Sequence, residues 1–69
     1  MIETRITVEK LATMSEDEEY DFKVVCKNFA TDMKFYFGVE YYSIYWEEQN
    51  FLLAKLAMPE LDFYLETVK

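Results

Sequence analysis

The feature that most limits this chain is what it lacks: within 69 residues it has one cysteine, Cys26, and no histidine. A single cysteine permits no internal disulfide, and without histidine the common zinc ligand sets are out of reach. A domain of this size buries only about 60% of the surface that its unfolded chain exposes. Its stability must therefore come from apolar side chains, which make up 52% of the residues. We expect a single domain spanning residues 1–69, with no metal and no cofactor.

The aromatic content exceeds what so small a core needs, because six Phe, six Tyr and one Trp make 19% of the chain aromatic. Short chains commonly gain stability by oligomerisation. In addition, residues 2–8 alternate in the period of a β-strand, and no partner strand is evident in the same chain. An unpaired strand edge invites pairing with a second chain. We therefore expect a homodimer.

The charge balance is strongly acidic, with 14 Asp and Glu against seven Lys and Arg and a net charge of −7. This disfavours direct contact with nucleic acid or with an anionic membrane, because both are bound through basic side chains. It favours a protein partner with a basic surface. No apolar run approaches the roughly 20 residues of a membrane span, and the N-terminus lacks the pattern of a signal peptide. Together with a free cysteine, these features predict a soluble cytoplasmic protein.

The clearest helix signal begins at Ser15, which forms an S-x-x-E capping box with Glu18. An apolar stripe in the helical period follows. Its members are Phe22, Val25, Cys26, Phe29, Met33, Tyr36 and Phe37. Gly38 then stands where a left-handed C-terminal cap is favoured. These signals predict a helix over residues 16–37.

Two further helices are predicted toward the C-terminus. Over residues 40–57, aromatic and aliphatic side chains recur on one helical face, and Pro59 suits the first turn of a final helix. Near the N-terminus, Thr7 can cap a helical turn over residues 8–14. The predicted fold is mainly α: a small three-helix domain with a short N-terminal β-strand.

A competing pattern covers residues 33–46. Two sets of residues alternate there in the period of a strand, namely Met33, Phe35, Phe37 and Val39, and then Tyr42, Ile44 and Trp46. Aromatic and β-branched residues favour strands. If this alternation is the true period, the fold is α+β with a small antiparallel sheet over residues 33–46.

The sequence offers no catalytic constellation. Without histidine, Ser-His-Asp and Cys-His arrangements are excluded, and one glycine cannot build a phosphate-binding loop. Glu47 and Glu48 are adjacent and would point about 100° apart on a helix, so they do not converge on one substrate. Cys26 lies on the apolar stripe and is expected to be a core residue. We expect binding rather than catalysis.

Carboxylates form the first candidate surface for a partner. They are Glu16, Asp17, Glu18, Glu19 and Asp21 in one run, with the separate pair Glu47 and Glu48. Two interpretations of the run stay open. Acidic residues in the first turn complement the helix dipole, which accounts for their position without any partner. Alternatively, the run mimics the spaced negative charge of nucleic acid and docks in a basic cleft.

Aromatic residues form the second candidate surface, and they are Tyr41, Tyr42, Tyr45 and Trp46. An aromatic stripe at helical spacing is usually core. Tyrosine and tryptophan are also enriched in interface hot spots, however, and three short helices cannot enclose them all. We expect part of this patch to face a partner or a second copy of the chain.

In length, charge and aromatic content, the chain resembles the small acidic proteins that phages and other mobile elements make against host nucleases and other defence proteins, anti-CRISPR proteins among them. The resemblance implies an inhibitor that occupies a basic, nucleic-acid-binding surface of a host protein. The alternative is a structural or regulatory interaction module, antitoxin-like or a small subunit, that binds through its aromatic face. Binding by charge weakens steeply with salt, whereas binding in a hydrophobic groove barely responds to it.

Overall fold

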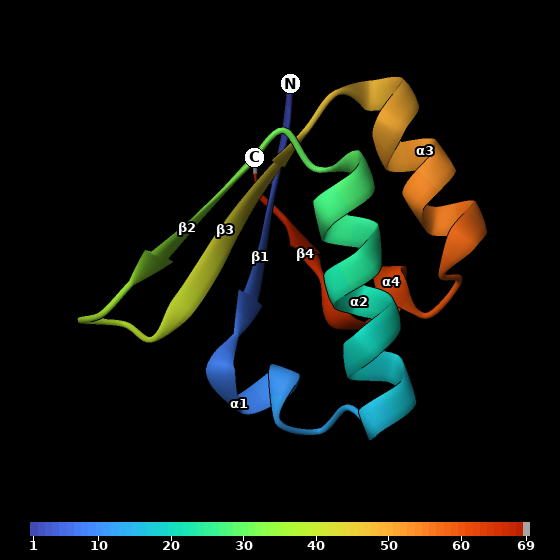
Figure 1. Cartoon of the computed structure of the whole chain (residues 1–69). Helices are drawn as coiled ribbons and strands as arrows, with labels where there is room; N and C mark the ends of the chain where they lie inside the picture. Colours follow the sequence, from blue (N-terminus) through green and yellow to red (C-terminus); the bar gives the residue numbers. More distant parts are fainter. Residues whose placement is uncertain (69) are drawn as a thin grey trace.

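The structure, a computed structural model, describes residues 1–68 as four strands and four helices. In chain order they are β1 (Ile2–Thr7), α1 (Val8–Leu11), α2 (Glu16–Phe29), β2 (Asp32–Tyr36), β3 (Tyr41–Trp46), α3 (Glu48–Ala57), α4 (Leu61–Tyr64) and β4 (Glu66–Thr67). The strands form one antiparallel sheet in the order β2-β3-β1-β4. Figure 1 shows α2 and α3 side by side on one side of this sheet.

The predicted mainly α fold is wrong, and the α+β alternative describes the chain. The helix that begins after Ser15 ends at Phe29, and residues 32–36 and 41–46 are strands instead. Met33 and Phe37 belong to the helical stripe and to the strand alternation alike, so the local pattern does not separate the two. Strand pairing decides between helix and strand. β3 forms backbone hydrogen bonds with β2 on one side and with β1 on the other, so its backbone groups are satisfied as those of a central strand.

Gly38 does not cap a helix, contrary to the sequence prediction. It lies in the turn between β2 and β3, and its φ is not positive. The positive φ in this turn, 52°, belongs to Glu40. A Cβ built on Gly38 would meet nothing within 4 Å, so a side chain is tolerated there.

The C-terminal helices are shorter than predicted. Of the expected helix over residues 40–57, only α3 at Glu48–Ala57 is helical. After Pro59 the chain forms the single turn α4 and then the two-residue strand β4. The predicted helical turn with Thr7 as its cap is present as α1, where the Thr7 hydroxyl accepts the Lys10 N–H at 3.0 Å.

The predicted N-terminal strand is confirmed, but it is not unpaired. β1 pairs with β3 along its whole length and with β4 on its other side. One of the two reasons for expecting a homodimer, the lack of a partner strand, is therefore removed. The partner was hidden from sequence reasoning because it lies about 40 residues away, in the stretch predicted to be helical.

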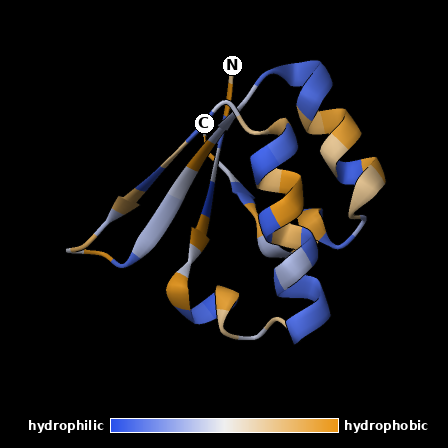
Figure 2. Cartoon of the chain, in the orientation of Figure 1, coloured by the Kyte–Doolittle hydropathy of each residue, from blue (hydrophilic) through white to orange (hydrophobic). Residues whose placement is uncertain are grey.

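The core lies between the sheet and the two longer helices. Its buried apolar side chains are Ile6, Met14, Phe22, Val25, Cys26, Ile44, Trp46, Phe51, Ala54, Met58, Leu61, Tyr64 and Leu65. Figure 2 shows hydrophobic segments along α3 and the middle of α2, and a hydrophilic first turn of α2. Thr4 and Ser43 are the buried polar residues among those described. The Thr4 hydroxyl donates to the Ile44 carbonyl at 3.1 Å and accepts the Trp46 indole N–H at 2.8 Å.

The capping box at the start of α2 is confirmed. The Glu18 N–H donates to the Ser15 hydroxyl at 3.2 Å, and the Ser15 N–H donates to the Glu18 carboxylate at 3.0 Å. We expect Ser15→Ala to lower the free energy of unfolding by about 1 kcal/mol, because one N-terminal N–H then loses its acceptor. Urea titration followed by circular dichroism measures the change. An unchanged midpoint would show that the cap contributes nothing to stability.

Candidate protein-binding surfaces

The acidic run predicted from the sequence begins at the N-terminus of α2, which follows α1 in the chain (Figure 1). Glu16, Asp17 and Asp21 are exposed, while Glu18 and Glu19 are half-buried. Glu19 pairs with Lys23 at 3.0 Å. Among the described residues, Glu16 and Asp17 make neither a salt bridge nor a side-chain hydrogen bond, so their charges are not compensated locally.

Glu18 differs from its neighbours because it is held in place from two sides. Its carboxylate accepts the Ser15 N–H and, at 2.7 Å, the hydroxyl of Tyr64. The bond from the Ser15 N–H, followed by that from Tyr64, lowers the pKa of Glu18. The bond to Glu18 raises the pKa of Tyr64, with burial and the negative charges of Glu18 and Glu60 adding to the effect. This link fastens α4 to the first turn of α2.

The structure brings Glu60 close to Tyr64, the residue that binds Glu18 of the run, although Glu60 is more than 40 residues away in sequence. Glu60 precedes α4, is exposed, and acts on Tyr64 together with Glu18. We call the carboxylates of Glu16, Asp17, Glu18, Glu19 and Glu60 the acidic end. Sequence reasoning missed Glu60 because nothing in the sequence shows that α4 packs on the start of α2.

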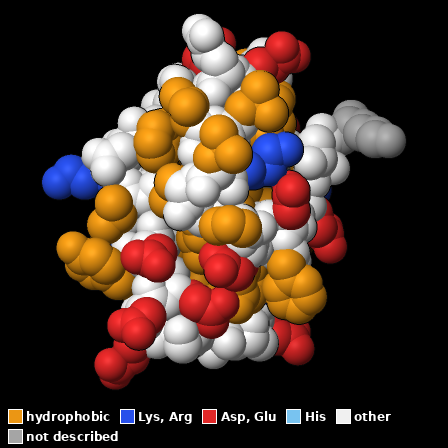
Figure 3. Space-filling view, turned by 90° about the vertical axis from the view of Figure 1, so that its right-hand side faces the viewer, with side chains coloured by type: hydrophobic (Ala, Val, Ile, Leu, Met, Phe, Trp, Pro, Cys, Tyr) orange, Lys and Arg blue, Asp and Glu red, His pale blue; other side chains and the backbone are white. Residues whose placement is uncertain are grey.

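Figure 3 shows the helical side of the molecule, with acidic side chains over the lower half and at the upper edge and hydrophobic ones between them. The exposed apolar residues of these helices include Tyr20, Leu53, Leu56 and Phe63. Tyr20 and Phe63 are each 70% exposed. Tyr20 comes directly after Glu19 in the sequence. Phe63 lies on α4, and the centroid of its ring is 4.2 Å from the Lys10 ammonium nitrogen. Tyr20 is therefore the exposed aromatic side chain next to the acidic run, whereas Phe63 lies among Arg5, Lys10 and Tyr41.

The second predicted acidic pair lies apart from the first. Glu47 precedes α3 and Glu48 opens it, at the end of the helical layer opposite to Glu16 (Figure 1). The 14 residues of α2 separate the two groups by about 20 Å. The seven predicted carboxylates therefore form two separate acidic sites.

The predicted aromatic patch does not form one surface either, because its members alternate along β3. Trp46 is fully buried, which corrects its place in the predicted surface, and Tyr42 points to the same side of the sheet. Tyr41 and Tyr45 point to the face opposite the helices. The rings of Tyr41 and Tyr36 are stacked, with centroids 5.1 Å apart, and the Arg5 guanidinium carbon lies 4.7 Å from the Tyr41 ring centroid. This open face was not predicted as a unit.

Tyr45 belongs to the same open face and is held by polar contacts. The pKa of Tyr45 is raised, first by a hydrogen bond with Tyr36 and then by burial and the negative charge of Glu3. The Glu3 carboxylate accepts a hydrogen bond from the Ser43 hydroxyl at 3.0 Å, and it lies 3.8 Å from the Arg5 Nε. The open face is therefore a connected tyrosine-rich network with both signs of charge.

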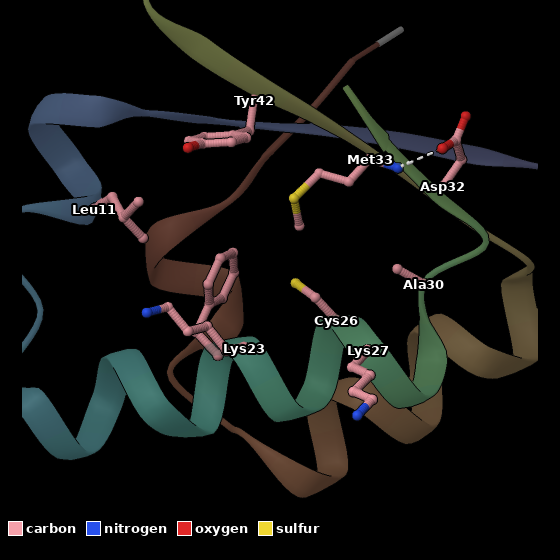
Figure 4. Close-up of a pocket in the computed structure, with 9 residues that line it drawn as sticks. Leu11, Lys23, Cys26, Lys27, Ala30, Asp32, Met33 and Tyr42 are labelled. Atoms are coloured by element: carbon pink, nitrogen blue, oxygen red, sulfur yellow. Dashed lines mark hydrogen bonds between the residues drawn. The ribbon is translucent and has the colours of Figure 1, made fainter. Parts of the chain in front are cut away.

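Between α2 and the β2–β3 hairpin lies a mostly apolar cavity of about 380 Å³ that is open to solvent. Its lining consists of Leu11, Phe22, Lys23, Cys26, Lys27, Ala30, Asp32, Met33 and Tyr42. Figure 4 shows Met33 and Tyr42 facing Cys26 across it, with Lys27 extending away from the sheet. Burial raises the pKa of the Cys26 thiol to about 12, in line with the core role predicted for it.

The link between Glu18 and Tyr64 predicts a pH dependence of stability. Because the pKa of Glu18 is lowered in the folded state, its contribution is present above the unfolded pKa and is lost as the pH falls through the folded value. The urea concentration at the unfolding midpoint should therefore decrease once the pH is lowered below about 4. In Glu18→Gln this decrease should be smaller. Glu9→Gln is the matched control on α1. An identical pH profile for wild type and Glu18→Gln would contradict the assignment.

Comparison with known protein families, with curated proteins and with solved structures gives no match for this chain. Within residues 1–68, no helix is long and apolar enough to cross a membrane. The same residues contain no group of three or more Cys, Asp or Glu side chains arranged to hold a metal ion.

Proposed function

We propose that this protein binds a basic, nucleic-acid-binding surface of another protein through its acidic end and so blocks that surface. In the setting that its composition resembles, the partner is a cytoplasmic host defence protein of a cell infected by a phage or mobile element. The observation that carries the proposal is that two distant segments meet at the start of α2: Tyr64 of α4 bonds to Glu18, and the charge of Glu60, just before α4, acts on the same tyrosine. Among the described residues, Glu16, Asp17 and Glu60 have no salt-bridge partner.

A helix dipole alone does not account for this arrangement. Acidic residues in the first turn of α2 complement its dipole, but Glu60 precedes a helix of only four residues. Uncompensated carboxylates that share one end of a molecule create a local negative potential. Such a potential speeds encounter with a basic surface and suppresses binding to acidic ones.

Exposed aromatic side chains can supply affinity that charge alone does not. Interface affinity is concentrated in a few desolvated residues, among which aromatic types are enriched. Tyr20 is exposed next to the acidic run and can be buried by a partner. The proposed interface therefore combines carboxylates that steer association with an aromatic group that slows dissociation.

The open sheet face supports a second candidate function, a structural or regulatory interaction module. Tyr36 and Tyr41 are stacked there beside Arg5, on the face of the sheet opposite α2 and α3. Binding through this face would bury tyrosine rings and would depend little on salt. The two candidates therefore predict different responses to ionic strength.

The proposal is tested by capture from a lysate of the host cell. Tagged protein is incubated at low salt, washed, and then challenged with duplex DNA, with structured RNA, or with high salt. We expect a retained protein that binds nucleic acid by itself and is released by nucleic acid and by salt. A retained protein that neither nucleic acid nor salt displaces would refute the acidic end as the interface and favour the open sheet face.

A further inference from the structure

The sheet has one long edge that the described chain leaves unpaired. β2 pairs only with β3, whereas the opposite edge is formed by the two-residue strand β4. Exposed strand edges are templates for pairing, and natural proteins protect them with short strands, prolines or charges. β4 is protected by its length. β2 has five residues, contains no proline, and carries only Asp32 and Lys34 as charges.

At this edge the described chain also leaves part of the apolar core uncovered. The apolar cavity of about 380 Å³ lies between α2 and the hairpin that contains β2. Figure 4 shows Met33 of β2 pointing into it. Met33 is 40% exposed and Phe37, just beyond the strand, is 84% exposed. The free backbone edge, the cavity and the exposed apolar side chains therefore lie on the same side of the molecule.

We propose that a second copy of this chain covers this edge, with the two β2 strands paired antiparallel about a two-fold axis at Met33. The two four-stranded sheets then become one continuous sheet with the helices of both copies on the same face. This inference does not rest on the proposed function, because it does not involve the acidic end.

Charge selects the register of this pairing. A two-fold axis at Asp32 or at Lys34 would place identical charges directly opposite each other, which is destabilising. An axis at Phe35 would leave Asp32 opposite Gly38. The axis at Met33 places Asp32 of each copy opposite Lys34 of the other, which gives two cross-strand ion pairs. Among these registers only that one joins opposite charges.

The local hydrogen bonding is compatible with this register. The Met33 N–H donates to the carboxylate of Asp32 at 2.8 Å rather than to a carbonyl of β3. On pairing, that N–H passes to a carbonyl of the second copy, and the Asp32 carboxylate becomes free to meet Lys34 of the second copy. Side chains alternate along a strand, so both Met33 side chains remain on the helical side, next to the two cavities.

The test is sedimentation equilibrium from about 1 μM to about 1 mM, at a single moderate salt concentration. Wild type should approach twice the 8.4 kDa mass of one chain. Asp32→Lys and Lys34→Asp should each raise the dimer dissociation constant by about tenfold or more, because each creates two like-charge pairs. The double variant Asp32→Lys, Lys34→Asp should restore the wild-type value, because it exchanges the partners of each pair.

Glu66→Lys on β4 is the matched control, since it makes the same charge change as Asp32→Lys at the opposite edge. It should leave the dissociation constant unchanged, and circular dichroism should show every variant folded. A monomeric wild type at all concentrations would overturn the proposal. So would a dimer that the two single variants leave unchanged, or a double variant as weak as either single one.

Discussion

Replacing Trp46 by alanine is expected to lower the free energy of unfolding by about 3–5 kcal/mol. The side chain is 0% exposed, and its ring packs on Phe51 with centroids 5.3 Å apart. Its indole N–H bonds to the hydroxyl of Thr4, so the substitution removes both packing and a buried hydrogen bond. Domains are stable by only about 5–15 kcal/mol, so the variant should be partly unfolded at 37 °C. Urea titration with circular dichroism measures the loss.

Two variants calibrate this result. Trp46→Phe keeps an aromatic ring and removes the N–H, so its loss should be smaller than that of Trp46→Ala. Tyr20→Ala removes an exposed aromatic ring from α2 and should change stability by no more than about 0.5 kcal/mol. If Trp46→Ala were as mild as Tyr20→Ala, Trp46 would lie on the surface, as the sequence suggested.

Reversing the acidic end is expected to have the largest effect on binding. The triple variant Glu16→Lys, Asp17→Lys, Glu60→Lys should associate with the captured partner about 10–100-fold more slowly at low salt, because steering depends on the charge at the interface. Glu18 is left intact because it caps α2 and holds Tyr64. Glu19 is left intact because it pairs with Lys23. Stopped-flow or surface binding measures the rate.

The control for this variant carries the same number of reversals elsewhere: Glu47→Lys, Glu48→Lys, Glu66→Lys. Each reversal adds two charges, so both triples bring the net charge from −7 to −1. A difference between them therefore reports the place of the charge and not its total. Lysines in the first turn oppose the helix dipole in both α2 and α3, so folding is checked first. Equal rates for the two triples would count against the acidic end.

The sequence predicted those parts of the fold that depend on neighbouring residues. The capping box of Ser15 and Glu18 is local, and so is the alternation that defines β1. Residues 33–46 depend instead on pairing with β1, about 40 residues away, and their aromatic side chains suit a helix stripe and a strand alike. The enrichment of tryptophan in interfaces favours a surface position for Trp46, but strand geometry places its side chain in the core.

The candidate surfaces follow the same rule. The run from Glu16 to Glu19 was visible because its members are adjacent in sequence, and α2 begins where predicted. Glu60 joined it only through the packing of α4 on α2. The cavity and the free edge at β2 could not be predicted, because both require knowing that β2 is a strand at the border of the sheet.

The most direct test of the acidic end is the association rate with the captured partner, measured for wild type and both triple variants over a range of ionic strength. The Debye length falls from about 30 Å at 0.01 M salt to about 10 Å at 0.1 M, so steering by exposed charge weakens over this range. We predict a steep fall for wild type, a shallower fall for the Glu47, Glu48, Glu66 variant, and almost none for the Glu16, Asp17, Glu60 variant. A wild-type rate that stays constant across the series would contradict binding through the acidic end.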